Sequence, residues 1–208
     1  MKLYYMPGAC SLGIHVILEE IGKPYDVQKI DGAAQEQYGA DFVKINPKSK
    51  VPTLTKDDGA TLTEFPAIAV WLARKNPDMG LLPADADGEA AALEAMDYAV
   101  STMHMQGFSR MFRPANYAPT ETDHDTVKAR GKEIMEKGLA LMDKTLEGKE
   151  YLAGKFSVAD AALFYVEFWA AGRMKMPLPK NVAAHYARMK ARPAVARVLE
   201  QEGLTAAA

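Results

Sequence analysis

The chain has 208 residues, enough for one domain or two small ones, and its 25 basic and 27 acidic side chains give a net charge of −2. It carries no long run of like charge and no basic stripe, so we expect no nucleic-acid partner. No apolar stretch approaches the roughly 20 residues that span a bilayer, and no signal-peptide pattern opens the sequence, so we expect no membrane partner. A single cysteine excludes an internal disulfide and predicts a reducing, cytoplasmic location.

The first 76 residues alternate between strand and helix patterns. The strand signals are short runs of alternating polar and apolar residues, and the helix signals are apolar residues at a spacing of three and four. An Asp-Gly turn at Asp58-Gly59 predicts a β-hairpin. The elements expected, in chain order, are a strand at 2–5, a helix at 11–21, a strand at 25–30, a short helix at 41–45, hairpin strands at 52–55 and 60–63, and a helix opening at Glu64.

Beyond residue 84 the pattern is helical throughout. Ser157 and Asp160 form a variant of the capping box, with Asp in place of Glu, ahead of an apolar run. Glycine and proline residues separate the helical stretches, which we expect near 88–112, 123–146, 157–171, 181–191 and 194–202. The sequence therefore predicts an α/β domain at 1–78, a linker at 79–87 and an all-α domain at 88–208.

Cys10 lies where the first helix should begin. A thiol at a helix N-terminus faces unpaired backbone N–H groups and the positive end of the helix dipole, and both favour the thiolate. We therefore expect its pKa to lie below the free value of about 8.5. The alternative is a small buried hydrophobic residue, which is the role of most lone cysteines.

The predicted order of strand, helix, strand, helix, hairpin and helix is that of a thioredoxin-like domain. The chain also resembles the bacterial beta-class glutathione S-transferases over its whole length. The motifs that carry this resemblance are Met1-Lys2-Leu3-Tyr4-Tyr5 with Pro7-Gly8-Ala9-Cys10-Ser11, Asn46-Pro47-Lys48 leading to Val51-Pro52, Leu62-Thr63-Glu64, His104, and Phe156-Ser157-Val158-Ala159-Asp160-Ala161. The resemblance implies a homodimeric enzyme that transfers the sulfur of glutathione, its co-substrate, to small electrophiles such as aryl halides, without a metal. It also implies an acceptor-substrate site in the all-α domain.

The resemblance assigns roles to particular residues. Val51 would precede a cis proline and pair its backbone with the cysteinyl part of glutathione, and Glu64 would bind the γ-glutamyl end. Asp97 would reach across the dimer interface toward the ammonium of the partner's glutathione. The implied catalytic residues are Cys10, Ser11 and His104, and the implied glutathione-binding residues are Tyr5, Cys10, Gln35, Val51, Pro52, Glu64, Phe65, Asp97, Ser101 and His104.

The predicted elements constrain several of these positions further. Tyr4 and Tyr5 are consecutive in a strand, so they point to opposite faces and at most one reaches the site. Asp97 and His104 are seven residues apart in a predicted helix, with Ser101 between them, so they share roughly one face. Ser11 is a candidate donor to the sulfur, or a helix cap.

Two residues depart from the family pattern. Phe65 stands where a small Ser or Gly is usual, and we expect its ring to crowd the rim of the γ-glutamyl subsite. Gln35 stands where a Lys often meets the glycyl carboxylate, and Lys48 and Lys50 are interpreted as solvated lysines. These departures predict weaker glutathione binding than in a typical member, or a preference for a modified or different thiol.

Two further functions stay open beside conjugation. Cys10 could form a mixed disulfide with glutathione and pass it on, in thiol–disulfide exchange. The chain could also be a non-catalytic interaction module that keeps the fold, and Phe65 and Gln35 favour that hypothesis.

Overall fold

A computed structural model describes residues 1–205, which form two compact units. The first unit contains Met1–Leu82 and the segment from Arg188 onward, and the second contains Pro83–Ala187. The predicted all-α domain ran unbroken to residue 208; its last three positions lie outside the described residues, and its final helix groups with the first unit. Within residues 1–205, no helix has the length and apolar character needed to cross a membrane.

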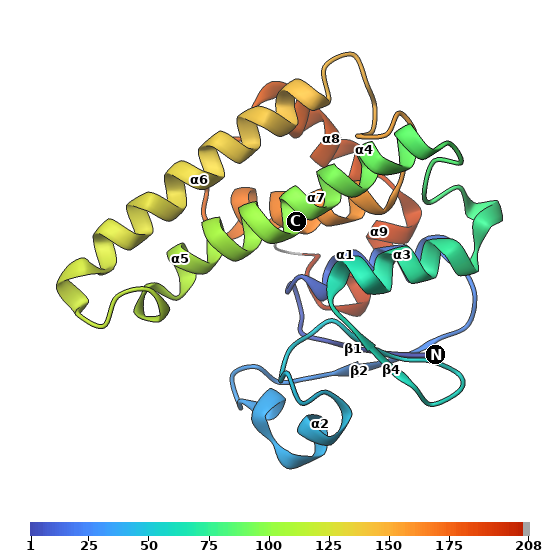
Figure 1. Ribbon diagram of the computed structural model, residues 1–208, viewed down its shortest axis with the longest axis horizontal. Helices are drawn as coiled ribbons and strands as arrows, with labels where there is room; N and C mark the ends of the chain where they lie inside the picture. Colours follow the sequence, from blue (N-terminus) through green and yellow to red (C-terminus); the bar gives the residue numbers. More distant parts are fainter. Residues whose placement is uncertain (206–208) are drawn as a thin grey trace. The chain divides into compact units, whose positions relative to one another are not determined.

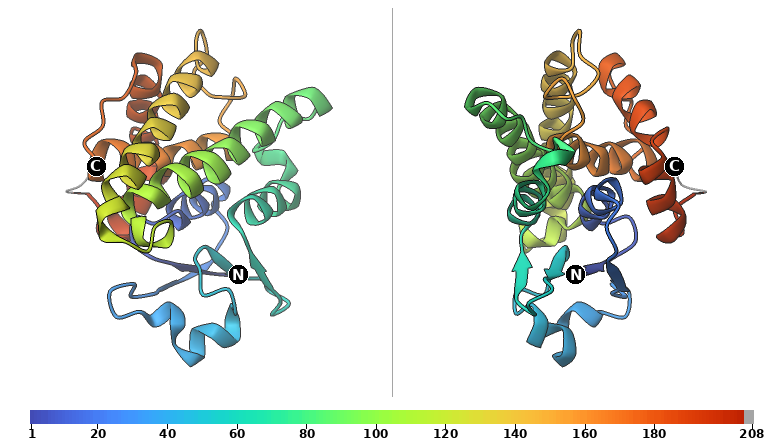
Figure 2. Two further views of the ribbon diagram at one scale, coloured as in Figure 1. Left: turned by 60° about the vertical axis from the view of Figure 1, so that its left-hand side comes forward. Right: turned by 90° about the vertical axis from the view of Figure 1, so that its right-hand side faces the viewer.

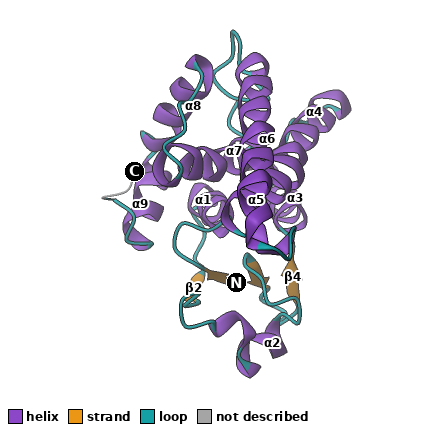
Figure 3. Cartoon of the chain, turned by 90° about the vertical axis from the view of Figure 1, so that its left-hand side faces the viewer, coloured by secondary structure: helices purple, strands orange, loops and turns teal. Residues whose placement is uncertain are grey.

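The first unit holds a four-stranded sheet, which Figure 3 shows as the orange elements. The strand order is β2-β1-β3-β4, with β1 parallel to β2 and antiparallel to β3, and β3 antiparallel to β4. This confirms the predicted hairpin and the thioredoxin-like order. The elements are β1 (Lys2–Tyr5), α1 (Ser11–Ile21), β2 (Asp26–Lys29), η1 (Glu36–Tyr38), α2 (Ala40–Ile45), β3 (Thr53–Thr55), β4 (Thr61–Thr63), α3 (Phe65–Lys75), η2 (Pro77–Met79) and α9 (Pro193–Gln201).

Alternation along β1 decides which helices cover each face of this sheet. Tyr4 points toward α2, where its ring lies 5.8 Å from that of Phe42 in a small cluster with Ile30. Tyr5 points the other way, and its ring lies 5.5 Å from that of His15 on α1. The prediction that the two tyrosines face apart is confirmed. In Figure 1, α1 and α3 accordingly lie on one side of the strands and α2 on the other.

The described part of the second unit is built from helices. Figure 2 shows its two longest helical runs side by side, the green run at 86–112 and the yellow α6. Its elements are α4 (Ala86–Asp97), η3 (Tyr98–Phe108), α5 (Ser109–Phe112), η4 (Pro114–Asn116), η5 (Glu121–Asp123), α6 (His124–Thr145), α7 (Val158–Phe168), η6 (Trp169–Arg173) and α8 (Lys180–Lys190), of which residues up to Ala187 belong to this unit.

The helix predicted near 88–112 is irregular in its middle. The segment η3 is π-helical, with backbone bonds between residues five apart, such as the one from the Ser109 N–H to the His104 carbonyl. It packs closely on α6. A Cβ added at Gly131 of α6 would lie only 2.7 Å from the Gly107 carbonyl oxygen of η3, so there is room only for glycine at this contact. Periodicity in the sequence predicts a helix here and does not distinguish the two windings.

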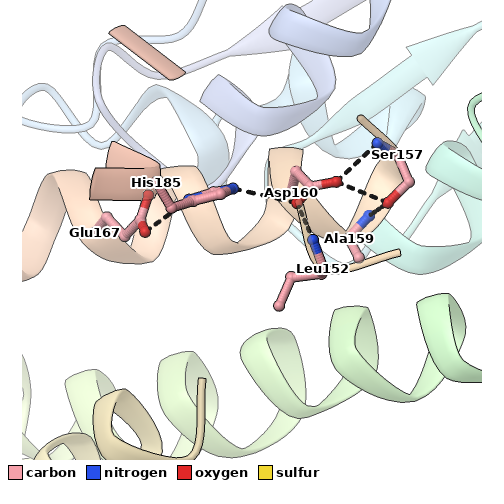
Figure 4. Close-up of polar contacts among 6 residues, drawn as sticks. All are labelled: Leu152, Ser157, Ala159, Asp160, Glu167 and His185. Atoms are coloured by element: carbon pink, nitrogen blue, oxygen red, sulfur yellow. Dashed lines mark hydrogen bonds and ion pairs between the residues drawn. The ribbon is translucent and has the colours of Figure 1, made fainter. Parts of the chain in front are cut away.

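The predicted capping box at the start of α7 is confirmed. One Asp160 oxygen accepts from the Ser157 N–H at 2.8 Å and from the Ser157 hydroxyl at 2.9 Å. The other accepts from the Leu152 N–H at 2.8 Å and lies 3.2 Å from His185 Nε2. The second ring nitrogen of His185 lies 2.8 Å from Glu167 Oε1, so one imidazole bridges two carboxylates (Figure 4).

This Asp160–Glu167–His185 cluster is fully buried, and two of its groups have raised pKa values. Burial raises the pKa of Glu167 to about 7, although His185 opposes the shift. Burial alone would lower the pKa of His185, but the charge of Glu167 and the bonds to both carboxylates outweigh it and raise the pKa to about 9. The cluster is therefore stabilised by protons that the unfolded chain binds less well.

We predict that this cluster makes the folded protein less stable as the pH rises. The contribution of Glu167 to the free energy of unfolding is complete below its ordinary pKa of 4.5 and is lost as the pH rises through about 7. The contribution of His185 is complete below its ordinary pKa of 6.5 and is lost as the pH rises through about 9. Urea unfolding across this range measures the slope. The double variant Glu167→Leu/His185→Phe removes both titrating groups and leaves Asp160 with its donors from Leu152 and Ser157, so it should have a flatter profile. An equal slope in both proteins would contradict the prediction.

Candidate functional site

The turn between β1 and α1 brings Cys10 to the backbone of Val51. Gly8 has a positive φ of 65°, and the turn is closed by the Ala9 N–H bonding the Met6 carbonyl at 3.0 Å. The Cys10 thiol then donates to the Val51 carbonyl at 3.3 Å. The Val51–Pro52 peptide is cis, as the resemblance implied. Two predicted site residues from distant parts of the sequence are therefore in direct contact.

The Cys10 thiol is held in its neutral form. Its burial raises the pKa to about 12, while the backbone N–H groups of Cys10 and Ser11 and the charge of Lys50 lower it only in part, and Glu64 raises it further. The expectation of a lowered pKa is wrong because desolvation of the thiolate outweighs the helix N-terminus. At neutral pH the group is therefore a hydrogen-bond donor, and its nucleophilic thiolate form is scarce.

A carboxylate and an ammonium lie together at the start of α3. Glu64 has a positive φ of 72° and a largely exposed side chain, whose Oε1 lies 2.7 Å from Lys48 Nζ. The same Nζ donates to the Thr63 hydroxyl at 2.9 Å. Lys48 is solvated, as expected, with 52% of its side chain exposed, and it is also paired with Glu64. Opposite charges held side by side can bind the ammonium and carboxylate of an amino-acid-like group.

Gln35 lies on the exposed loop ahead of η1. Its φ is 58°, and its N–H bonds the Gly32 carbonyl at 3.3 Å. The carboxylate of Asp31 fixes the same loop by accepting from the N–H groups of Ala33 at 2.8 Å and Ala34 at 3.1 Å. The Gln35 side chain is exposed and uncharged, so it can offer a neutral amide to a ligand but no counter-charge.

The second unit carries the other predicted site residues. The Ser101 hydroxyl donates to the exposed Asp97 carboxylate at 3.3 Å, which confirms that these two side chains are neighbours. His104 is partly buried, with its Nδ1 3.3 Å from the Tyr165 hydroxyl and its ring 4.7 Å from that of Trp169. Because η3 is π-helical, the seven-residue spacing no longer fixes the angle between Asp97 and His104.

Comparison with known proteins identifies the family. Residues 8–75 match the glutathione S-transferase N-terminal domain and residues 125–200 match the glutathione S-transferase C-terminal domain. The chain is 37% identical to glutathione S-transferase GstA of Escherichia coli O157:H7 over 208 residues, which is 98% of this chain and 100% of that protein. The chain belongs to the glutathione S-transferase family.

Solved structures agree with this assignment. A Sulfitobacter glutathione transferase homologue with bound glutathione superposes with a TM-score of 0.88 at 30% identity and covers 98% of each chain. The beta-class glutathione S-transferase of Sphingomonas chungbukensis has a TM-score of 0.84 at 35% identity, covering 99% of this chain and 100% of that one. The predicted family, the fold class and the assignment as a transferase are thereby confirmed, and an enzyme is favoured over the non-catalytic module.

Ser11 is bonded to the backbone of the turn that precedes it. The residue is fully buried, and its hydroxyl accepts from the Met6 N–H and donates to the Met6 carbonyl, both at 3.3 Å. Tyr5 is also buried, which raises the pKa of its phenol together with the charge of Glu202. In this transferase both side chains help to shape the turn that carries Cys10.

Sequence reasoning missed a buried link between this turn and the end of the chain. Glu202 accepts from the Gly8 N–H at 2.8 Å and from His15 Nδ1 at 2.8 Å, and the side chains of Glu202 and His15 are fully enclosed. The two partners are 187 residues apart in sequence, so no local pattern joins them. The available signal was a polar residue, His15, inside an otherwise apolar stretch of α1.

The structure corrects the position of Phe65. Its side chain is only 3% exposed, so the ring is buried and does not stand at an exposed rim. The expected exposed position of the ring is wrong, and its effect on glutathione binding stays a prediction. The helical pattern could not separate the two cases, because the first residue of a helix can point inward or outward.

We predict that Phe65→Ser destabilises the protein and does not tighten glutathione binding. Truncating a buried aromatic side chain costs about 3–5 kcal/mol and buries a hydroxyl in place of the ring. Urea unfolding measures the loss, and isothermal calorimetry measures the affinity at a temperature where the variant is folded. Phe65→Leu, which keeps an apolar side chain, should recover most of the stability. A stable Phe65→Ser protein with tighter binding would restore the rim hypothesis.

Proposed function

We propose that this transferase conjugates the sulfur of glutathione to small electrophiles, with Cys10 acting as a neutral donor to the glutathione thiolate. The contact between the Cys10 thiol and the Val51 carbonyl carries this proposal. A glutathione backbone that pairs with Val51 would place its own sulfur beside Cys10. A neutral S–H can donate a hydrogen bond to that sulfur.

The protonation state of Cys10 removes an objection to conjugation. A cysteine thiolate in the sulfur subsite would repel the glutathione thiolate, since like charges at close range disfavour each other. With its pKa raised to about 12, Cys10 carries no charge at neutral pH. When the glutathione backbone takes over the Val51 carbonyl, the Cys10 S–H would turn from that carbonyl to the developing thiolate and stabilise it.

The remaining predicted residues complete the proposed site. Glu64, paired with Lys48, would bind the ammonium of the γ-glutamyl group, and Gln35 would donate to the glycyl carboxylate. His104 would contact the glutathione sulfur. The acceptor would be an aryl halide or an unsaturated carbonyl, and its site would lie in the second unit. A single cysteine and the use of a reduced thiol fit a cytoplasmic protein.

We predict that Cys10 reacts as a high-pKa thiol in the folded protein. Its alkylation by iodoacetamide, followed by intact mass, should accelerate about tenfold per pH unit from neutrality to about pH 10, because the thiolate fraction rises tenfold per unit below the pKa. Since Cys10 is the single cysteine, one adduct reports on it alone. The urea-unfolded chain is the control and should level off near its free pKa of about 8.5. A plateau at neutral pH in the folded protein would contradict the proposal.

Thiol–disulfide exchange is the second candidate, because Cys10 is half-buried as a residue, although its thiol group is enclosed. Its thiolate would attack one sulfur of oxidised glutathione, forming a mixed disulfide and releasing one glutathione thiolate. The raised pKa makes the attacking thiolate scarce, so this reaction should be slow beside conjugation. Cys10→Ser keeps a donor and loses the nucleophile; it should retain conjugation of an aryl halide and lose all exchange. Loss of conjugation in this variant would favour covalent use of Cys10.

We further propose a homodimer in which Asp97 binds the ammonium of the partner's glutathione. The exposed Asp97 carboxylate uses one oxygen to accept from Ser101, which holds the side chain in place. Asp97→Asn should weaken glutathione by about 1.5–3 kcal/mol, the usual contribution of a charged hydrogen bond. Calorimetry with glutathione and with an analogue that lacks the amino group isolates this contribution. Equal losses for both ligands would place Asp97 outside the ammonium site, and a monomer by light scattering would end the cross-subunit proposal.

A further inference from the structure

His104 is held by two aromatic side chains from one helical run, α7 and η6. Its Nδ1 lies 3.3 Å from the Tyr165 hydroxyl. The Tyr165 ring meets it edge-on at 5.7 Å and 82°, and the Trp169 ring at 4.7 Å and 86°. Tyr165 is fully buried and Trp169 almost so, so neither ring can turn away without opening the core. The orientation of the imidazole is therefore fixed by its surroundings.

The Tyr165 contact also bears on which ring nitrogen of His104 carries the proton. A neutral imidazole has one N–H and one acceptor nitrogen, and the partner of one nitrogen sets the state of the other. The Tyr165 hydroxyl can accept from an Nδ1–H or donate to a bare Nδ1, and when it donates the imidazole proton lies on Nε2. A thiolate accepts hydrogen bonds and cannot donate them, so with Nδ1 occupied by Tyr165 only an Nε2–H group can bond an anionic sulfur.

The backbone at His104 is also unusual. Its carbonyl accepts from the Ser109 N–H, five residues on, within the π-helical segment η3. Such segments are rare and occur frequently at functional sites. The irregular winding and the two buried rings together define one place and one orientation for the His104 side chain.

We propose that Tyr165 is a positioning residue that holds His104 in the neutral tautomer with its proton on Nε2. His104 then donates a hydrogen bond, and not a proton, to the glutathione sulfur as the sulfur becomes anionic. The inference rests on the proposed function, in which His104 contacts that sulfur. Trp169 packs against the imidazole and keeps it from rotating, and the Tyr165 hydroxyl selects the tautomer.

The tautomer can be read directly, without measuring activity. Nitrogen-15 shifts of labelled imidazoles distinguish protonated from unprotonated ring nitrogens, and the chain has four histidines, so His104→Ala assigns the signal. We expect Nε2–H for His104 in the wild type and a mixture of tautomers in Tyr165→Phe, which keeps the ring and removes the hydroxyl. The matched control is Tyr186→Phe, a buried tyrosine of the same unit whose ring packs on Phe164. Nδ1–H in the wild type, or an unchanged signal in Tyr165→Phe, would overturn the proposal.

Kinetics separate this inference from the proposed function. In conjugation of an aryl halide, Tyr165→Phe should raise the apparent pKa in the pH profile of kcat/KM and lower kcat about 2- to 10-fold, the equivalent of one neutral hydrogen bond, with KM for glutathione unchanged. In a His104→Ala background the same substitution should add nothing. A shifted profile for His104→Ala with none for Tyr165→Phe would overturn this inference alone. An unchanged profile for His104→Ala would overturn both it and the proposed role of His104.

Discussion

In the first unit, one buried carboxylate connects three segments of the chain. Glu202 accepts from the Gly8 N–H and from His15, and so ties the turn before Cys10, helix α1 and the segment after α9 together. A buried carboxylate is tolerated only when its oxygens are bonded, so these contacts are mutually required. Because Gly8 is two residues before Cys10, the same contacts fix where the thiol meets the Val51 carbonyl. The position of the Cys10 thiol is thus linked to a residue near the far end of the sequence.

Two opposing effects act on Cys10, and their relative size decides its chemistry. The first N–H groups of α1 stabilise negative charge, whereas enclosure of the thiol removes the water that would solvate it. Desolvation is the larger effect here and keeps the thiol neutral. A neutral donor and an anionic acceptor form a favourable pair, whereas two thiolates would repel each other. The same residue type at a better solvated helix start would serve exchange chemistry instead.

Local patterns predicted what local interactions determine. The hairpin at Asp58-Gly59 and the capping box at Ser157 follow from short-range hydrogen bonds, so the sequence displays them. The contact between Cys10 and Val51 was accessible only through the resemblance to a family. Three features had no local signature: the inward direction of Phe65, the pairing of His15 with Glu202, and the π-helical winding of η3. Each depends on packing against segments distant in the chain, which periodicity does not report.

The buried cluster in the second unit constrains the order in which its residues can change. Loss of His185 first would leave Asp160 and Glu167 enclosed together without a cation, and breaking such a group costs about 3–5 kcal/mol. Loss of Glu167 first leaves His185 bonded to Asp160, which still has its backbone donors. Apolar replacement of a complete buried ion pair is often neutral or stabilising. Loss of Glu167 and then of His185 therefore costs less at its first step than the reverse order, and it leaves Asp160 held by its donors from Leu152 and Ser157.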